Sequence, residues 1–237
     1  MPEKLKVSVL MPTYNEKGNI YPLAEEIIKR LRKAGYEDEI IIIDDNSPDG
    51  TWESVKKLQK KYKSVKGILR TKERGLGKAL KRGINESTGE VIAIMDCDFS
   101  HPPEIIPIML KELGNADAVF ASRYVKGGNM KTNKPQYYLS KLFNHSMKAF
   151  LGIQVLDCTN GFFVIRKKAL EGLDMDGIFD GYGEYSFNLL YALKPKNLRI
   201  KEIPFSYMPR RYGSSKTRLL HAGISYWIQA FRLRLGR

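Results

Sequence analysis

Short apolar runs alternate with helix-like patterns over the first half of the chain. Between the first two runs, Leu23, Ile27 and Leu31 recur at helical spacing, and Asn19 and Pro22 before them are typical helix-start residues. Runs that predict strands occupy positions 6–11, 39–44, 65–69, 90–95 and 118–121. Strands that alternate with helices predict an α/β fold with a mostly parallel, twisted sheet flanked by helices.

The pattern changes after Tyr124. Gly-rich and basic segments follow, with two amphipathic helices and short strands at 162–165 and 199–203. We therefore expect one domain over residues 1–216, in which a nucleotide half (1–123) precedes an acceptor half (124–216). Residues 217–237 are expected to form a separate basic, amphipathic helix.

Composition and charge narrow the class of partner. The 237 residues, 43% of them hydrophobic, are enough to bury a core. The 40 basic and 26 acidic residues give a net charge of +14, which favours nucleic acid, an anionic membrane face or phosphorylated substrates as partner. Cys97 and Cys158 lack metal-site spacing and are expected to be free thiols rather than a disulfide. The longest apolar stretches are too short for a spanning helix, so we expect a cytosolic or peripheral protein.

Four polar clusters fall at the carboxyl ends of the predicted strands, at positions 12–16, 44–49, 74–78 and 96–101. Ligands of open α/β sheets bind outside the carboxyl ends of the strands, so these clusters are expected to meet at one site. Ordinary polar loops would explain any one cluster, but not the charged side chains that occur in all four.

The pair Asp96 and Asp98 follows an apolar run directly, which could bring both carboxylates to one cation. Carboxylate and diphosphate oxygens are the ligands that Mg²⁺ and Mn²⁺ prefer. The alternative is that the pair caps the helix expected near Pro103. Asp44 and Asp45 could accept hydrogen bonds from a nucleoside, although one of them could instead close the turn.

The segment Arg74–Lys78 contains two glycines between basic residues. Glycines let the backbone approach a phosphate, and the Arg and Lys side chains neutralise its charge. The spacing fits neither a dinucleotide-binding fingerprint nor a P-loop.

Five motifs together resemble the family 2 glycosyltransferases of GT-A fold, and most of all the polyprenyl-phosphate hexosyltransferases such as dolichol-phosphate mannose synthases. They lie in order along almost the whole chain, at positions 11–16, 43–51, 96–103, 121–124 and 210–216. Five ordered motifs are far more specific than any single one. The resemblance implies an inverting transfer of mannose from GDP-mannose, or of another sugar from its nucleotide, to dolichyl or another polyprenyl phosphate, with Mg²⁺ or Mn²⁺ as cofactor.

The residues at the motif positions, together with the 74–78 segment and Lys141, give the candidate site. The expected metal ligands are Asp96 and Asp98. The expected catalytic residues are Asp98, Arg123, Arg210 and Lys216, and the acceptor phosphate is expected at Arg123 and Lys141. The expected nucleotide-sugar site comprises Pro12, Tyr14, Glu16, Ile43, Asp45, Arg74, Gly77, Lys78, Asp96, Cys97, Asp98 and Ser215.

The chain departs from the family pattern at three positions. Ser100 stands where some relatives have a metal-site Gln, and Lys141 stands where we expect an Arg. Asn188 lies near the usual place of a Glu, with Glu184 close by.

Two segments have the pattern of helices that lie on a membrane surface. In the last one, an apolar face opposes a polar face made of Arg218, His221, Ser225, Gln229 and Arg232; the apolar residues are Leu220, Ile224, Trp227, Phe231 and Leu235. In the other, Lys141, Asn144 and Lys148 oppose Leu139, Phe143, Met147 and Phe150. We expect peripheral docking on an anionic membrane surface, at its cytoplasmic face. The alternatives are packing on the domain or on a membrane-anchoring partner subunit.

Other functions are less favoured. A glucosyltransferase or another family 2 hexosyltransferase that uses a UDP-sugar remains an alternative. A sugar-1-phosphate nucleotidyltransferase would need a Gly-rich, Arg-bearing loop where this chain has residues 12–16. The charge allows RNA binding, but the chain lacks a recognisable nucleic-acid module, so no nucleic-acid partner is expected.

Overall fold

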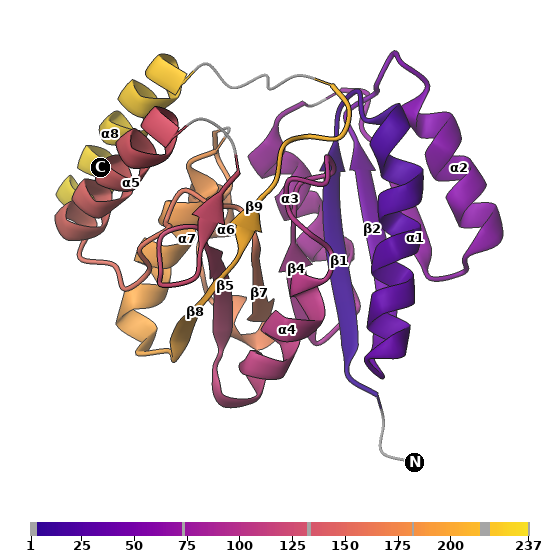
Figure 1. Ribbon diagram of the computed structural model, residues 1–237, viewed down its shortest axis with the longest axis horizontal. Coiled ribbons are helices and arrows are strands. Elements are labelled where there is room, and N and C mark those ends of the chain that lie inside the picture. Colours follow the sequence, from indigo (N-terminus) through magenta and orange to yellow (C-terminus); the bar gives the residue numbers. More distant parts are fainter. Residues whose placement is uncertain (1–3, 73, 132–133, 182, 214–218, 237) are drawn as a thin grey trace.

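The computed structural model describes residues 4–72, 74–131, 134–181, 183–213 and 219–236. The strands are β1 (Lys6–Thr13), β2 (Glu37–Asp44), β3 (Val65–Leu69), β4 (Val91–Ile94), β5 (Ala118–Ser122), β6 (Asn129–Met130), β7 (Phe163–Arg166), β8 (Ile200–Pro204) and β9 (Ser206–Tyr207). The helices are α1 (Lys17–Lys33), α2 (Thr51–Lys61), α3 (Leu76–Glu86), α4 (Ile105–Glu112), α5 (Lys134–Leu151), α6 (Met175–Ile178), α7 (Tyr185–Leu193) and α8 (Leu219–Leu235), as Figure 1 shows.

One seven-stranded sheet runs through the molecule in the order β3-β2-β1-β4-β7-β5-β8. Every neighbouring pair is parallel except those of β7, which runs antiparallel to β4 and to β5. The seven expected strands and the α/β fold are confirmed. Because β7 comes from the second half of the chain but lies between β4 and β5, the two expected halves share one sheet. Their functional division stays a prediction.

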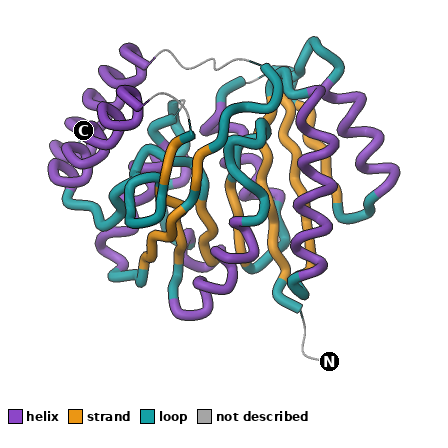
Figure 2. The backbone as a smooth tube through the Cα atoms, in the orientation of Figure 1, coloured by secondary structure: helices purple, strands orange, loops and turns teal. Residues whose placement is uncertain are grey.

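Helices cover both faces of this sheet, and strand residues alternate between them (Figure 2). On β1, Val9 packs with α1, α2 and α4, whereas Leu10 packs with α3 and α7 on the other face. On β2, Ile42 and Ile43 divide in the same way. The unbroken apolar runs of the sequence follow from this burial on two faces.

The predicted start of the first helix was wrong. Helix α1 begins at Lys17, so Asn19 and Pro22 both lie inside it. The Lys17 N–H donates to Oδ2 of Asp49, 3.1 Å away in the loop after β2. The Asn19 amide donates to Glu16 Oε2 at 2.6 Å. The helix start is thus fixed by a carboxylate 32 residues away, which local sequence patterns do not show.

Helices α5 and α8 pack side by side at the edge of the sheet opposite α1 and α2 (Figure 1). Their contact is aromatic, with the Trp227 ring 6.2 Å from Phe143 and 5.4 Å from Phe150. Met147 is fully buried. The expectation that these four residues belong to outward apolar faces was therefore wrong, because they fill the space between the two helices and the core.

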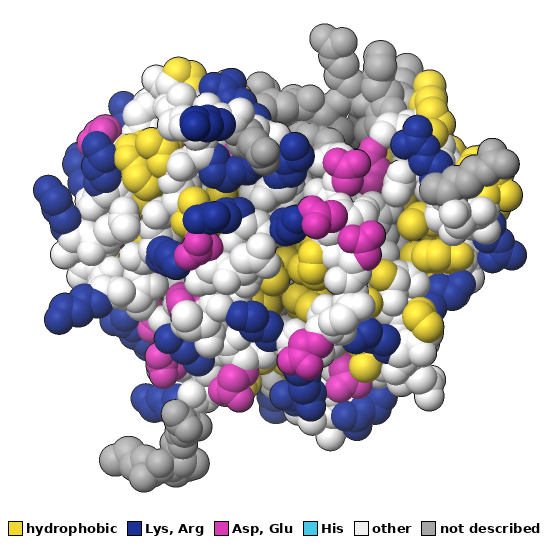
Figure 3. All heavy atoms as spheres, turned by 180° about the vertical axis from the view of Figure 1, so that it is seen from behind, with side chains coloured by type: hydrophobic (Ala, Val, Ile, Leu, Met, Phe, Trp, Pro, Cys, Tyr) yellow, Lys and Arg dark blue, Asp and Glu magenta, His cyan; other side chains and the backbone are white. Residues whose placement is uncertain are grey.

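Other apolar side chains on this helix pair are exposed, as the yellow atoms at the right edge of Figure 3 show, and Leu139, Ile224, Phe231 and Leu235 among them belong to the predicted apolar faces. The exposed set comprises Tyr138, Leu139 and Leu142 of α5 and Ile224, Ile228, Phe231 and Leu235 of α8. We call this set the apolar edge. Among the residues that the structure describes, no helix is both long and apolar enough to cross a membrane.

Candidate active site

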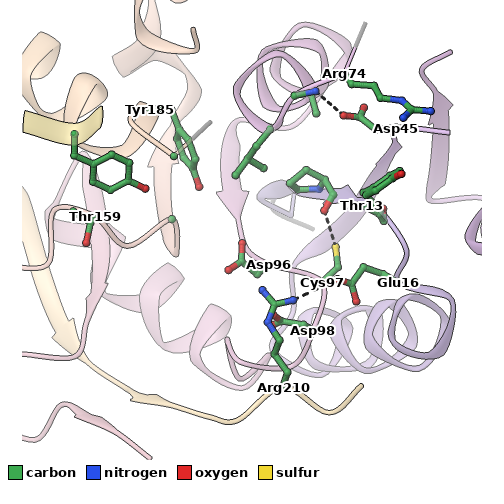
Figure 4. Close-up of a pocket in the computed structure, with 18 residues that line it drawn as sticks. Thr13, Glu16, Asp45, Arg74, Asp96, Cys97, Asp98, Thr159, Tyr185 and Arg210 are labelled. Atoms are coloured by element: carbon green, nitrogen blue, oxygen red, sulfur yellow. Dashed lines mark hydrogen bonds and ion pairs between the residues drawn. The ribbon is translucent and has the colours of Figure 1, made fainter. Parts of the chain in front are cut away.

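A cavity of about 450 Å³ lies at the carboxyl ends of β1, β2 and β4. Figure 4 shows Asp45 and Arg74 at one end, Asp96 near the middle, and Tyr185 and Thr159 at the other end. The expected site residues that line it are Pro12, Tyr14, Glu16, Asp45, Arg74, Asp96, Cys97, Asp98 and Arg210. The prediction that the polar clusters meet at one site is confirmed.

The two aspartates at the end of β2 have different tasks. Asp44 accepts hydrogen bonds from the Ser47 N–H at 3.3 Å and hydroxyl at 2.5 Å, so it closes the turn. Asp45 faces the cavity, where it accepts from the Gly75 N–H at 2.8 Å and pairs with Arg70 Nη1 at 2.9 Å. Burial raises the pKa of Asp45, although Gly75 and Arg70 act against this shift. Of the two aspartates, Asp45 is therefore the one that faces the cavity.

The glycine segment contributes to the cavity through Gly75, whose φ of 128° favours glycine. Gly77 faces elsewhere: a Cβ built on it would lie 2.1 Å from the carbonyl oxygen of Phe179. In the structure, the lack of a side chain at Gly77 lets α3 pack closely on the loop that contains Phe179 and Gly181. Lys78 lines an adjacent cavity, and Ile43 is fully buried in the core.

Asp98 lines the cavity next to Arg210 and is 1% exposed. Its Oδ1 accepts from the Ser100 N–H at 2.9 Å and hydroxyl at 2.5 Å, and its Oδ2 pairs with Arg210 Nε at 2.9 Å. Helix α4 begins only at Ile105, with Glu104 at its N-cap. Helix capping, the alternative interpretation of the aspartate pair, is thus excluded.

His101 positions Asp96 and was not among the predicted site residues. Its ring is buried, stacks on Phe162 at 4.6 Å and meets Phe205 edge-on. Its Nδ1 accepts the backbone N–H of Asp96 at 3.0 Å. The signal was present in the sequence, because His101 belongs to the same motif as the two aspartates.

The segment after β9 crosses the aspartate loop. The Met208 N–H donates to Ser100 O and the Arg211 N–H to Asp98 O, both at 3.1 Å. Arg210 is thereby placed over the cavity, 3.7 Å from Glu16 as well as against Asp98. The other two residues expected from this motif, Ser215 and Lys216, lie outside the described residues.

Arg123 lies in a buried ion pair. Its Nε and Nη2 donate to the Asp157 carboxylate at 2.8 and 2.6 Å, and its backbone N–H donates there as well. Asp157 is fully buried, and it raises the pKa of Arg123 although burial acts to lower it. Arg123 and Lys141, the expected acceptor-phosphate residues, stand outside the lining of the cavity. Lys141 lies on α5.

Both cysteines are buried and free, as expected. Burial raises the pKa of Cys97 well above its usual range and that of Cys158 to about 12. The Cys97 thiol, between the two aspartates, donates to Pro12 O at 3.3 Å. It therefore stays protonated and contributes shape rather than charge to the cavity.

Part of the cavity is lined by residues that the sequence did not indicate. They are Thr159, Gly161, Gly183, Tyr185 and Tyr226, and Figure 4 shows Thr159 and Tyr185 at the end away from Asp45. Tyr226 comes from α8, where the sequence showed only an amphipathic pattern.

The glycosyl transferase family 2 profile matches residues 8–174, which include the whole aspartate motif and most of the sheet. The chain therefore belongs to glycosyl transferase family 2. The resemblance seen in the motifs is confirmed.

Relatives of known name share most of the chain. A dolichol-phosphate mannosyltransferase of Pyrococcus furiosus is 39% identical over 90% of this chain. The match spans 59% of that relative's own length. A dolichol-phosphate mannosyltransferase of Saccharomyces cerevisiae is 32% identical over 90% of this chain and 81% of its own.

The solved structures confirm the fold. Glucosyl-3-phosphoglycerate synthase of Mycobacterium tuberculosis, in complex with Mn²⁺, UDP and phosphoglyceric acid, superposes with a TM-score of 0.71. The match covers 98% of this chain and 78% of that protein at 18% identity. The same synthase was also solved with Mg²⁺ and UDP.

Proposed function

We propose that the protein transfers mannose from GDP-mannose to the phosphate of dolichol or another polyprenol, with inversion at the anomeric carbon. The observation that carries the proposal is the single cavity in which nucleotide-type contacts, the aspartate pair and Arg210 meet. The names of the relatives at 32–39% identity support dolichyl phosphate as the acceptor and mannose as the sugar.

The donor would lie along the cavity. Its nucleoside would occupy the end formed by Pro12, Tyr14, Glu16 and Asp45, where Asp45 offers a carboxylate to N–H or hydroxyl donors. Its diphosphate would then reach Asp96 and Asp98. This order agrees with the positions of Asp45 and Asp96 in Figure 4.

The residues present fit a divalent ion. Within the described part of the chain, no cluster of three or more His, Cys, Asp or Glu side chains forms a complete metal site. Mg²⁺ is commonly bound by one or two carboxylates together with substrate phosphates and water. Asp96 and Asp98 would supply those carboxylates, and the ion would stabilise charge on the leaving diphosphate.

The reaction does not require a strong general base. An oxygen of the acceptor phosphate forms the new bond to the anomeric carbon, while the bond from that carbon to the diphosphate breaks and GDP leaves with the electron pair. The attacking oxygen is already ionised near neutral pH. Arg210 would stabilise the leaving group, and Lys216 would act with it. Arg123, held by Asp157, and Lys141 would guide the acceptor phosphate.

Transfer of labelled sugar to dolichyl phosphate in detergent tests the proposal, with GDP-mannose and UDP-glucose compared as donors. We expect transfer from GDP-mannose that depends on Mg²⁺ or Mn²⁺ and stops with chelator. Asp96→Asn is expected to abolish transfer without unfolding the protein, whereas the exposed control Asp176→Asn is expected to be active. Transfer from UDP-glucose alone would replace mannose with glucose, and near-normal turnover by Asp96→Asn would remove that carboxylate from the mechanism.

We infer further that the apolar edge of α5 and α8 rests on a membrane. Two exposed basic residues, Arg232 and Arg234, lie beside Phe231 and Leu235 on α8. A basic residue near an anionic surface contributes about 1 kcal/mol, and the cytoplasmic leaflet carries the anionic lipids. These features favour peripheral docking at that face over burial against a membrane-anchored subunit.

Co-sedimentation with vesicles tests this docking. We expect binding to vesicles that contain phosphatidylserine, weaker binding to neutral vesicles, and loss of binding in Leu142→Glu/Ile228→Glu. Unchanged binding of the double variant would place the contact elsewhere.

A further inference from the structure

The C-terminal helix brings one side chain into the candidate active site. Tyr226 of α8 and Tyr185 of α7 both line the cavity, and Figure 4 shows Tyr185 at the end opposite Asp45. The Tyr226 hydroxyl lies against Gly183, two residues before Tyr185. The proposed donor does not occupy this end of the cavity, so the acceptor can bind there. The helix that exposes the apolar edge on one side therefore forms part of the cavity on its other side.

Both tyrosines are fixed by close contact with glycines. A Cβ on Gly183 would lie 2.1 Å from the hydroxyl oxygen of Tyr226, and one on Gly161 would lie 1.9 Å from that of Tyr185. The Tyr226 ring also meets Phe187 of α7 edge-on at 5.4 Å. Real Cβ atoms do not approach oxygen so closely, so only glycine leaves room for the hydroxyls at these positions.

Two polar contacts set the register of α8 against α7. The Ser225 hydroxyl donates to Oε1 of Glu184, and the Gln229 amide donates to Asn188 Oδ1 at 3.3 Å. Ser225 and Gln229 are four residues apart on α8, and Glu184 and Asn188 are four residues apart at the start of α7, so the two contacts are about one helical turn apart. Glu184 and Asn188 are 8% and 2% exposed, so both contacts lie at the edge of the core.

This packing is opposite to that of an ordinary surface helix, whose apolar face covers the core, and it agrees with the orientation expected of a helix that lies on a membrane surface. The polar residues Ser225 and Gln229 face the domain, while Ile224 and Ile228 are 64% and 51% exposed. A helix that served only as an anchor would have no need of buried polar partners, because burying them is favourable only when they are hydrogen-bonded. The polar contacts fix the direction in which the residue between them, Tyr226, points.

We propose that α8 is a wall of the acceptor site and that Tyr226, with Tyr185, binds the phosphate end of the prenyl acceptor. The rings offer apolar surface to the first isoprene units, and a tyrosine hydroxyl is able to donate to a phosphate oxygen. The proposal rests on the proposed function and adds to it the residues that hold the acceptor.

Calorimetry measures the equilibrium binding of a soluble prenyl phosphate of two isoprene units to the full chain, without detergent or vesicles. Because no membrane is present, this binding distinguishes α8 as part of the acceptor site from α8 as a membrane anchor only. We expect Tyr226→Ala to raise the Kd at least about tenfold, the loss of roughly one aromatic contact. The matched control Tyr62→Ala changes the residue just after α2, on the opposite face of the sheet from Tyr226, and is expected to bind like the wild type. Tyr226→Phe keeps the ring in place and is expected to fall between the wild type and Tyr226→Ala.

The outcomes are distinct from those of the transfer assay. A wild type that binds the prenyl phosphate but transfers no sugar would refute the proposed donor and leave the acceptor wall supported through the Kd values. Wild-type affinity in both Tyr226 variants would overturn the proposal and leave α8 as an anchor. Absence of binding by the wild type would overturn it as well.

Discussion

The close packing of Gly77 gives a sharp prediction. A Cβ at this position would lie 2.1 Å from the carbonyl oxygen of Phe179, 2.9 Å from its carbon and 3.1 Å from the carbonyl oxygen of Gly181. These neighbours are backbone atoms, so no side-chain rotation relieves the overlap. Helix α3 and the loop would have to separate by roughly 1 Å to restore ordinary contact.

The magnitude follows from two opposing terms. Alanine in place of glycine inside a helix stabilises by up to about 1 kcal/mol. Overpacking of a tight contact costs up to about 3 kcal/mol. We therefore expect Gly77→Ala to lower the free energy of unfolding by about 2 kcal/mol. The control Gly114→Ala, where a Cβ meets nothing within 4 Å, is expected to change it by less than about 0.5 kcal/mol.

Urea unfolding followed by circular dichroism measures both variants, with the shift in midpoint compared at unchanged m-value. A Gly77→Ala variant as stable as the wild type would refute the packing argument. If that stable variant also bound GDP poorly, Gly77 would have the phosphate-approach role that its motif first suggested.

Two further predictions concern buried charges. Asp157→Asn leaves the Arg123 guanidinium buried without its counter-charge. Because loss of one partner of a buried pair costs about 3–5 kcal/mol, we expect urea unfolding to show a decrease of that size in the free energy of unfolding. A decrease below about 1 kcal/mol would mean that water reaches Arg123. Burial opposes ionisation of Glu39, but hydrogen bonds from Ser8 and Thr88 lower its pKa overall. The stabilisation is therefore present above the ordinary glutamate pKa and lost as the pH falls through the lowered one. Glu39→Gln is expected to be less stable than the wild type at pH 7, with the difference vanishing in acid, and a pH-independent difference would contradict this assignment.

The sequence alone was sufficient where the signal is local. A buried strand needs a run such as residues 39–44, and the run appears as β2 whatever surrounds it. The two aspartates after β4 were identified because ligands of open α/β sheets bind outside the carboxyl ends of the strands, and the structure places both on the cavity. The family was legible for the same reason, since its motifs are short and ordered.

The tertiary structure decided what depends on partners far along the chain. Asp45 and Asp44 are adjacent in sequence, yet only contact with Gly75 shows that Asp45 belongs to the cavity. The Arg123 side chain meets Asp157, 34 residues away, which no spacing rule predicts. Helical periodicity showed that the last helix has two faces but not which face the domain buries, because that choice depends on the groups that α7 presents. Tyr226 lies in the cavity for this reason, and the sequence by itself gave no sign of it.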